Sequence, residues 1–233
     1  PHLFRPVATH RLEVRVAYYI THAARSPLAI HDAETDRLLL RGWHESDLPE
    51  WVAMNADEDV RRYFPDLLTP EVAIERAVEY QEELVTNGFG LWAVETREAI
   101  AYLDSDNRPN LLPPSSFIGF IGIHKMDTDI PALDDGTPVS YEICWRLAKE
   151  AWGQGLATEG AQAARDYAFG IERFPILGSY TTAENAPSRR VMEKVGIRLA
   201  VEFTHPALPE GYKNCVLYSM KMSDWSFTHA NED

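Results

Sequence analysis

The 233-residue chain has only two cysteines and no long apolar run. Cys144 and Cys215 are too few for the disulfide framework of a small secreted domain, and both fall in apolar, strand-like stretches. We therefore expect buried free thiols in a reducing compartment, which favours a cytoplasmic location. No run approaches the roughly 20 apolar residues of a membrane-spanning helix, so we expect no membrane partner.

Basic residues are also scarce. Lys and Arg number 22 against 36 Asp and Glu, which gives a formal net charge of −14 at pH 7. A nucleic-acid-binding protein needs a basic surface that displaces counterions, so the composition argues against nucleic acid as a partner. An acidic surface attracts a cationic amine substrate. Solubility alone explains a negative charge in many proteins, so the charge selects no partner by itself.

The most informative stretch runs from Val139 to Gly170. Its first part alternates as a strand with one apolar face, expected to carry Val139, Tyr141, Ile143, Trp145 and Leu147. The other face is expected to carry Ser140, Glu142, Cys144 and Arg146. Gly153 and Gly155 follow, and a helix-patterned segment then ends at Gly170, a residue typical just after a helix. The two glycines therefore lie on a strand-to-helix turn.

Such a turn suits a phosphate group. A helix N-terminus offers unpaired N–H groups and the positive end of the helix dipole, and glycines let a phosphate approach the backbone. The stretch lacks the Gly-Lys-Ser/Thr of a P-loop and the three glycines of a dinucleotide fingerprint. For the Gly-x-Gly pair alone, a purely structural role in the turn explains the sequence equally well.

Further motifs favour the functional interpretation. They are Glu142-Ile-x-Trp-x-Leu147, Trp152-Gly-Gln-Gly-Leu-Ala157, Asn185-x-x-Ser188 and Met192-Glu-Lys-x-Gly196. Over roughly residues 36–225 the chain resembles the GNAT acetyltransferases, especially the branch related to the RimJ and RimL N-acetyltransferases. The resemblance implies an α/β (α+β) fold in which helices flank a mostly antiparallel mixed sheet, with one parallel strand pair at the cofactor crevice. The domain is expected at residues 35–225, between an N-terminal extension (1–34) and a C-terminal tail (226–233).

The resemblance also implies acetyl-CoA as the acyl donor and no metal. Backbone groups of Trp145, Arg146 and Leu147 are expected to pair with the pantetheine amides as an added strand would. The loop expected to wrap the pyrophosphate consists of Trp152, Gly153, Gln154, Gly155, Leu156, Ala157 and Thr158. Asn185 and Ser188 are expected on the pantetheine arm, and the cations expected near the phosphates are Arg189, Arg190 and Lys194. Trp152 stands where the family usually has Gln or Arg, which removes one polar contact to the phosphates.

Acetyl transfer to an amine requires a base, and Glu142 is the leading candidate. It lies on the polar face of the strand that should border the thioester, and apolar neighbours are expected to raise its pKa. The alternative is an ion pair with Arg146. Where many GNAT enzymes have a tyrosine acid, this chain has Met192. Ser188 is the nearest substitute, although helix capping or a pantetheine contact explains it equally well.

The acceptor is expected to be a small amine or a protein N-terminus. Candidate acceptor contacts are Tyr63 and Phe64, with Pro65, in the loop between two predicted helices, and His205 in the last connection; simple packing explains each of them as well. The insertion at residues 97–116 narrows the acceptor side and favours small amines. Two alternatives stay open: a CoA-binding module without catalysis, and a transferase of a longer acyl group such as succinyl.

The remaining pattern predicts strands at residues 36–42, 89–95, 117–124, 176–182, 197–204 and 214–222. Helices are expected from Ser46, as the N-cap, to about residue 55, from Thr69-Pro70-Glu71 to Asn87-Gly88, and within residues 183–196. Residues 97–116 and 126–137 are expected to be surface loops, and the tail after Trp225 to be frayed.

Residues 1–34 precede the family resemblance. They hold several arginines and few acids, and residues 12–20 alternate as in a strand. A targeting peptide, an artefact of an upstream start and an ordered extra segment are all consistent with this pattern. We favour the ordered segment, packed on the sheet edge or on a second subunit of a homodimer.

Overall fold

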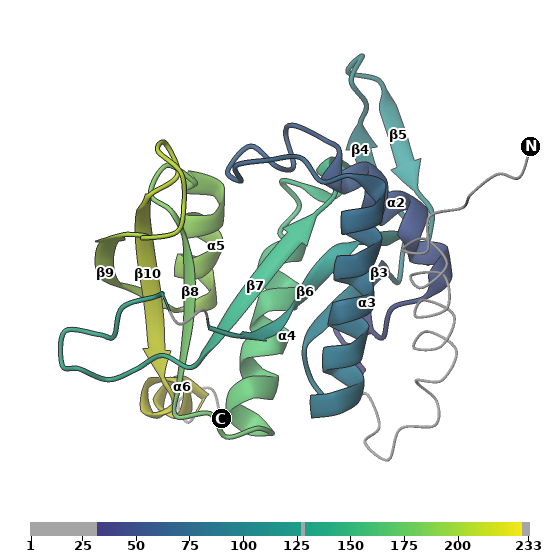
Figure 1. Cartoon of the computed structure of the whole chain (residues 1–233). Helices are drawn as coiled ribbons and strands as arrows, with labels where there is room; N and C mark the ends of the chain where they lie inside the picture. Colours follow the sequence, from purple (N-terminus) through teal and green to yellow (C-terminus); the bar gives the residue numbers. More distant parts are fainter. Residues whose placement is uncertain (1–31, 127–128, 230–233) are drawn as a thin grey trace, which may run out of the picture.

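The computed structural model describes residues 32–126 and 129–229, so the strand expected within residues 12–20 lies outside the described residues. The chain forms an eight-stranded sheet in the order β1-β2-β3-β6-β7-β8-β10-β9 (Figure 1). Its strands are β1 (Ala33–Glu34), β2 (Leu38–Arg41), β3 (Leu91–Thr96), β6 (Phe117–Lys125), β7 (Tyr141–Leu147), β8 (Ile176–Thr182), β9 (Arg198–Thr204) and β10 (Asn214–Lys221). Neighbours are antiparallel except β7 and β8, which are parallel. The predicted mixed, mostly antiparallel sheet is confirmed.

Helices cover both faces of this sheet. They are α2 (Leu48–Asn55), α3 (Pro70–Asn87), α4 (Leu156–Gly170), α5 (Ala186–Val195) and α6 (Met222–His229), with short 3-10 helices η2 (Glu45–Asp47) and η3 (Lys149–Ala151). Phe120 and Ile121 are consecutive on β6, so their side chains point to opposite faces. The Phe120 ring packs on α2 and α3, whereas a Cβ added to Gly160 of α4 would meet Ile121 at 2.3 Å. α2 and α3 therefore lie on one face, and α4 on the other.

An aromatic cluster joins α2 and α3 to the sheet. Trp43 lies 5.3 Å from Trp51 of α2 and 5.8 Å from Tyr80 of α3, measured between ring centroids. Its backbone N–H donates to Gln81 of α3, and its indole N–H donates to the carbonyl of Leu91 on β3, both at 2.8 Å. Large buried rings supply much of a core's apolar contact, so this cluster fixes the two helices on their face of the sheet.

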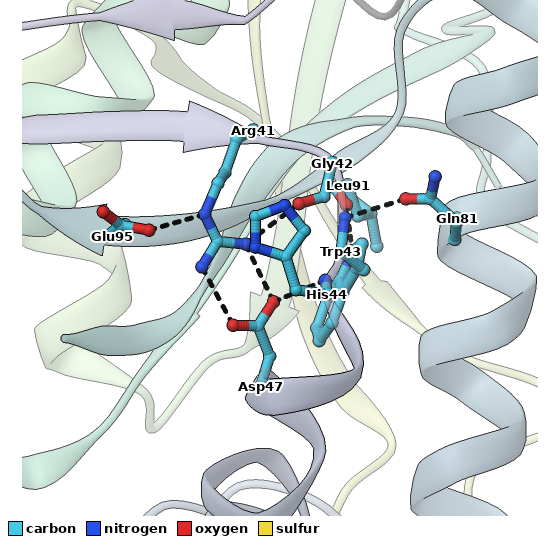
Figure 2. A network of polar contacts seen from close by, with 8 residues as sticks. All are labelled: Arg41, Gly42, Trp43, His44, Asp47, Gln81, Leu91 and Glu95. Carbon is cyan, nitrogen blue, oxygen red and sulfur yellow. Dashed lines mark hydrogen bonds and ion pairs between the residues drawn. The ribbon is translucent and has the colours of Figure 1, made fainter. Parts of the chain in front are cut away.

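Arg41, at the end of β2, is a buried cation whose charge is compensated (Figure 2). Its guanidinium bonds both carboxylate oxygens of Asp47 at 2.8 and 2.9 Å, Glu95 at 2.7 Å and the carbonyl of Gly42 at 2.9 Å. Arg41 is 6% exposed and Asp47 is 2% exposed. Because removing one member of a buried ion pair leaves an uncompensated charge, this network holds the start of α2 against β2 and β3.

The limits of α3 agree with the prediction, but the start of α2 does not. The Thr69 side chain accepts the N–H of Val72, and Gly88 ends α3 in the left-handed conformation with φ 80°. Ser46 was the expected cap of α2, yet it lies inside η2, and Asp47 is the residue before α2. The reason is the pairing of Asp47 with Arg41, six residues earlier, which places the helix start one residue later.

Two segments expected to be irregular are regular. Residues 97–116 contain a hairpin of β4 (Ile100–Leu103) and β5 (Pro109–Leu112), whose turn is closed by the Asp104 carboxylate accepting two backbone N–H groups. α6 continues to His229 instead of fraying after Trp225, whose indole N–H donates to Asp166 at 2.7 Å. Among residues 32–126 and 129–229, no helix has the length and apolarity to cross a bilayer.

Candidate active site

Strand β7 forms the centre of the candidate site. Among the described residues its register with β8 holds one pair, Glu142 opposite Gly178. Figure 1 shows β7 and β8 diverging beyond that point, whereas β7 pairs with β6 along its whole length. The backbone of β7 after Glu142 therefore has no strand partner on the β8 side, and the predicted parallel pair is confirmed.

The turn after β7 has the geometry of an anion-binding helix start. Gly153 and Gly155 have φ 75° and 82°, a left-handed conformation that side chains disfavour, and Gly155 is the N-cap of α4. A Cβ added to Gly153 would meet nothing within 4 Å, so the backbone there is openly accessible. The first amides of α4 and the positive end of its dipole fit the diphosphate of a coenzyme A molecule.

Sequence reasoning missed the contacts that hold this turn. Glu159, in the first turn of α4, accepts bonds from the Thr35 hydroxyl (2.6 Å), the Arg37 backbone (2.9 Å) and the Arg37 guanidinium (2.7 Å). Arg37 also donates to the carbonyl of Gln154 at 3.1 Å. Burial opposes ionisation of Glu159, but these bonds outweigh it and lower its pKa. The partners are about 120 residues apart in sequence, so no local pattern indicates them.

Two side chains of the predicted phosphate loop brace it instead of pointing to a ligand. The Trp152 indole N–H donates to the carbonyl of Leu147 at 2.8 Å, and the Gln154 amide donates to the carbonyl of Glu150 at 3.2 Å. Leu156 is fully buried in the core. Backbone amides of the loop are thus the groups left for a phosphate.

Glu142 lies on the face of β7 that α2 and α3 cover. It is 8% exposed, and its cross-strand neighbour is His124, whose Nδ1 lies 2.9 Å from the Glu83 carboxylate of α3. The bond to Glu83 raises the pKa of His124 despite burial, and the Glu142 charge adds to that effect. Burial, with the charges of Glu142 and Glu83, raises the pKa of the Cys144 thiol well above its ordinary value. A cation or a proton is therefore favoured here.

The side chain of Arg146 does not pair with Glu142, the partner that the sequence offered as an alternative. Its Nη1 donates to Asn55 Oδ1 at 2.8 Å, and its guanidinium lies over the Phe64 ring at 4.3 Å. No ion pair joins it to Glu142, although both residues are in the described part of the chain. The ion pair weighed for Glu142 and Arg146 is therefore absent.

The predicted pantetheine residues lie at the start of α5. Asn185 caps that helix: its Oδ1 accepts the N–H of Ser188 at 3.2 Å, and its Nδ2 donates to the Thr181 hydroxyl at 2.9 Å. The side chain of Asn185 is thus engaged in opening α5. Arg190 and Lys194 are exposed on α5, whereas Arg189 bonds the Tyr218 hydroxyl and the carbonyl of Ala183.

The predicted acceptor residues separate into two places. Phe64, 38% exposed, lies against Arg146 and so joins the face that carries Glu142, with the half-buried Tyr63 next to it. His205 is 3% exposed, and its Nδ1 accepts the N–H of Ala207 at 3.2 Å. These contacts suit a turn-stabilising histidine packed in the core. In the described residues no three His, Cys, Asp or Glu side chains are grouped as metal ligands.

Comparison with known proteins identifies the class. The family model of the acetyltransferase (GNAT) domain matches residues 37–198. The chain therefore belongs to the GNAT acetyltransferase family, as the motifs indicated, and is an N-acetyltransferase.

The individual relatives described next share between 12% and 27% sequence identity with this chain. The uncharacterized protein YkkB of Bacillus subtilis is 27% identical over 164 residues, which are 70% of this chain and 83% of YkkB. A GNAT-family acetyltransferase of Bacillus anthracis has a TM-score of 0.61 at 23% identity and covers 83% of this chain and 99% of its own. Spermidine N-acetyltransferase of Vibrio cholerae, in complex with CoA and spermine, has a TM-score of 0.59 at 18% identity, with coverages of 82% and 99%. RimL, a ribosomal L7/L12 α-N-protein acetyltransferase in complex with coenzyme A, has a TM-score of 0.58 at 12% identity, with coverages of 82% and 98%.

Proposed function

We propose that this protein transfers the acetyl group of acetyl-CoA to a primary amine by direct attack, with Glu142 as the general base, directly or through a water molecule. The single observation that carries the proposal is the position of Glu142 at the last paired residue of β7, where β7 and β8 begin to diverge. The donor supplies an activated thioester when bound. The chain's contribution is to hold it, remove a proton from the acceptor and stabilise the charge that develops.

The β7 backbone and the turn at Gly153–Gly155 are the groups that would hold the donor. Amides at the start of α4 bind the diphosphate, and the edge of β7 that β8 leaves open, at Trp145, Arg146 and Leu147, pairs with the pantetheine arm as an added strand would. The Leu147 carbonyl on this edge also accepts the Trp152 indole N–H. With pantetheine running back along β7, the thioester end reaches the point where β7 meets β8, which is beside Glu142. The neighbouring α5 start, with Asn185 and Ser188, borders the same strand gap from β8.

Glu142 takes the proton that the amine must lose. A protonated amine has no lone pair, so the carboxylate accepts one proton before or during the formation of the amide bond. The C–S bond then breaks, and the thiol sulfur takes up a proton in turn. The hydroxyl of Ser188 is the candidate donor for that last step. The acceptor is a small amine or a protein N-terminus, the two classes on which the spermidine enzyme and RimL act.

A thiol-release assay with purified full chain, acetyl-CoA and a panel of amines and peptides tests this function. Glu142→Gln, which keeps the shape of the side chain, is expected to lower kcat by roughly 10²-fold or more and to shift the pH profile. The dissociation constant for acetyl-CoA should stay unchanged. Unaltered turnover in this variant would exclude Glu142 as the base, and acetyl-CoA binding without turnover on any amine would favour a non-catalytic CoA-binding module.

A further inference from the structure

Arg146 shares a strand face with Glu142, four residues further along β7, which separates their Cα atoms by about 13 Å. In the register of β6 and β7, Glu142 is opposite His124 and Arg146 is opposite Phe120. Since the Phe120 ring packs on Trp51, this is the face that α2 and α3 cover. A small acceptor on this face lies between a carboxylate and a guanidinium.

Three aromatic rings surround the Arg146 guanidinium. Its central carbon is 4.3 Å from the ring centroid of Phe64, 5.5 Å from that of Phe120 and 5.7 Å from that of Trp51. Trp51 and Phe120 are 0% and 4% exposed, whereas Phe64 is 38% exposed. The rings favour a cation, and Phe64 is the most exposed of the three.

The hydrogen bonding of this guanidinium is incomplete. Nη1 donates to Asn55, but Nε is buried and has no partner among the described residues. Burial lowers the pKa of Arg146 to about 10, so the group is still a cation at neutral pH. With Nη1 engaged, Nε and Nη2 form the free edge of the guanidinium. That edge is the one that grips both oxygens of a carboxylate.

Arg41, a buried arginine with a structural role, provides a comparison within the same chain. Arg41 has two carboxylates, Asp47 and Glu95, within 2.9 Å of its guanidinium nitrogens. In contrast, no carboxylate of the described residues forms an ion pair with Arg146. Arg146 as a whole is half-buried, but its Nε is buried without a partner among the described residues, so the missing anion at Arg146 is the unusual feature.

A second arginine adds positive charge at the same place. Arg61 lies with its central carbon 4.6 Å from the Phe64 ring centroid, and its Nη1 is 3.4 Å from the Asn55 oxygen that Arg146 also uses. The acid that acts on Arg61 is Asp66. Two guanidinium groups therefore lie beside Phe64 and Asn55, with Asp66 acting on Arg61, and their positive charge repels a polyamine and attracts an anion.

We propose that Arg146 binds a carboxylate of the acceptor, so that the substrate is a small molecule carrying both a primary amine and a carboxylate. This inference rests on the proposed function. The carboxylate pairs with the free Nε–Nη2 edge, while the amine end of the substrate lies toward Glu142. The chemistry excludes polyamines as good acceptors and makes the acid group a determinant of specificity.

Matched acceptors test the inference with purified full chain. The panel consists of the α-amino acids, β-alanine and 4-aminobutyrate, each with its carboxamide and its aminophosphonate counterpart. The best carboxylate is expected to exceed its carboxamide by roughly 30-fold or more in kcat/KM. Arg146→Met should bring the carboxylate down to the level of its carboxamide, chiefly by raising KM for the acceptor. Arg146→Lys, which keeps the charge but loses the two-point edge, should lie between.

Arg62→Met is the matched control, since Arg62 lies next to Arg61 in the sequence but has a side chain that is 61% exposed. It should leave the preference for carboxylates unchanged. Three results would each overturn the inference and leave the proposed function standing. They are acetyl transfer without a preference for carboxylates, a carboxylate preference that persists in both Arg146 variants, and a preference for phosphonates over carboxylates. Failure of the wild type to acetylate any amine would instead contradict the proposed function, and the inference with it.

Discussion

Glu142 and Gly178 face each other as the one register pair between the parallel strands β7 and β8 in the described part of the chain. The pair brings the candidate base to the point where the two strands begin to diverge. The turn at Gly153–Gly155 follows a few residues after the end of β7, so a donor held at the start of α4 extends back toward Glu142. This geometry connects the proposed phosphate site to the proposed base through a single strand.

Gly153→Ala should weaken coenzyme A binding. Alanine at φ 75° costs about 1–2 kcal/mol and puts a methyl group at the open approach to α4. Gly136→Ala is the matched control, because Gly136 has φ 80° and an added Cβ there also meets nothing within 4 Å. Both variants should lose similar unfolding free energy. Only Gly153→Ala should raise the dissociation constant in calorimetry, by roughly tenfold; an equal or absent effect in both variants contradicts the phosphate site.

Asp47→Ala should strongly destabilise the fold without altering the turn at Gly153–Gly155. It leaves the buried Arg41 with Glu95 as its one ion-pair partner among the described residues, and breaking a buried pair costs about 3–5 kcal/mol. Glu79→Ala, which removes an exposed pair with Arg76, should cost less than about 1 kcal/mol. Urea unfolding of both variants measures the difference. Equal losses would mean that the Arg41 network does not hold α2.

His124 should titrate above its ordinary pKa of 6.5, because Glu83 stabilises its protonated form. Since the folded pKa is raised, the pair stabilises the fold fully below about pH 6.5, and the contribution disappears as the pH rises through the folded pKa. NMR titration of the ring protons in wild type and Glu83→Gln measures this. The variant should show a lower pKa for His124, while Glu79→Gln should show no change; identical curves in all three proteins would refute the pairing.

Local signals predicted the elements whose ends are set by neighbouring residues. Thr69 with Pro70 and Gly88 mark α3, and Gly153 with Gly155 mark the turn before α4, because capping and left-handed backbone are local requirements. The shared face of Glu142 and Arg146 on β7 is predicted for the same reason, since alternation has a period of two.

Local sequence patterns do not indicate contacts between distant segments. Glu159 holds the turn at Gly153–Gly155 through Arg37, 122 residues away. Arg146 donates a hydrogen bond to Asn55, 91 residues away in the sequence. Only tertiary packing decides which of several polar residues meets a given charge, so these side chains could not be assigned from spacing.

The most direct measurement is a crystal structure of the full chain with coenzyme A. The account predicts the diphosphate on the backbone amides of residues 153–157, the pantetheine along the unpaired edge of β7, and the sulfur within reach of the Glu142 carboxylate. A diphosphate elsewhere, or a sulfur on the far side of β8 from Glu142, would contradict it.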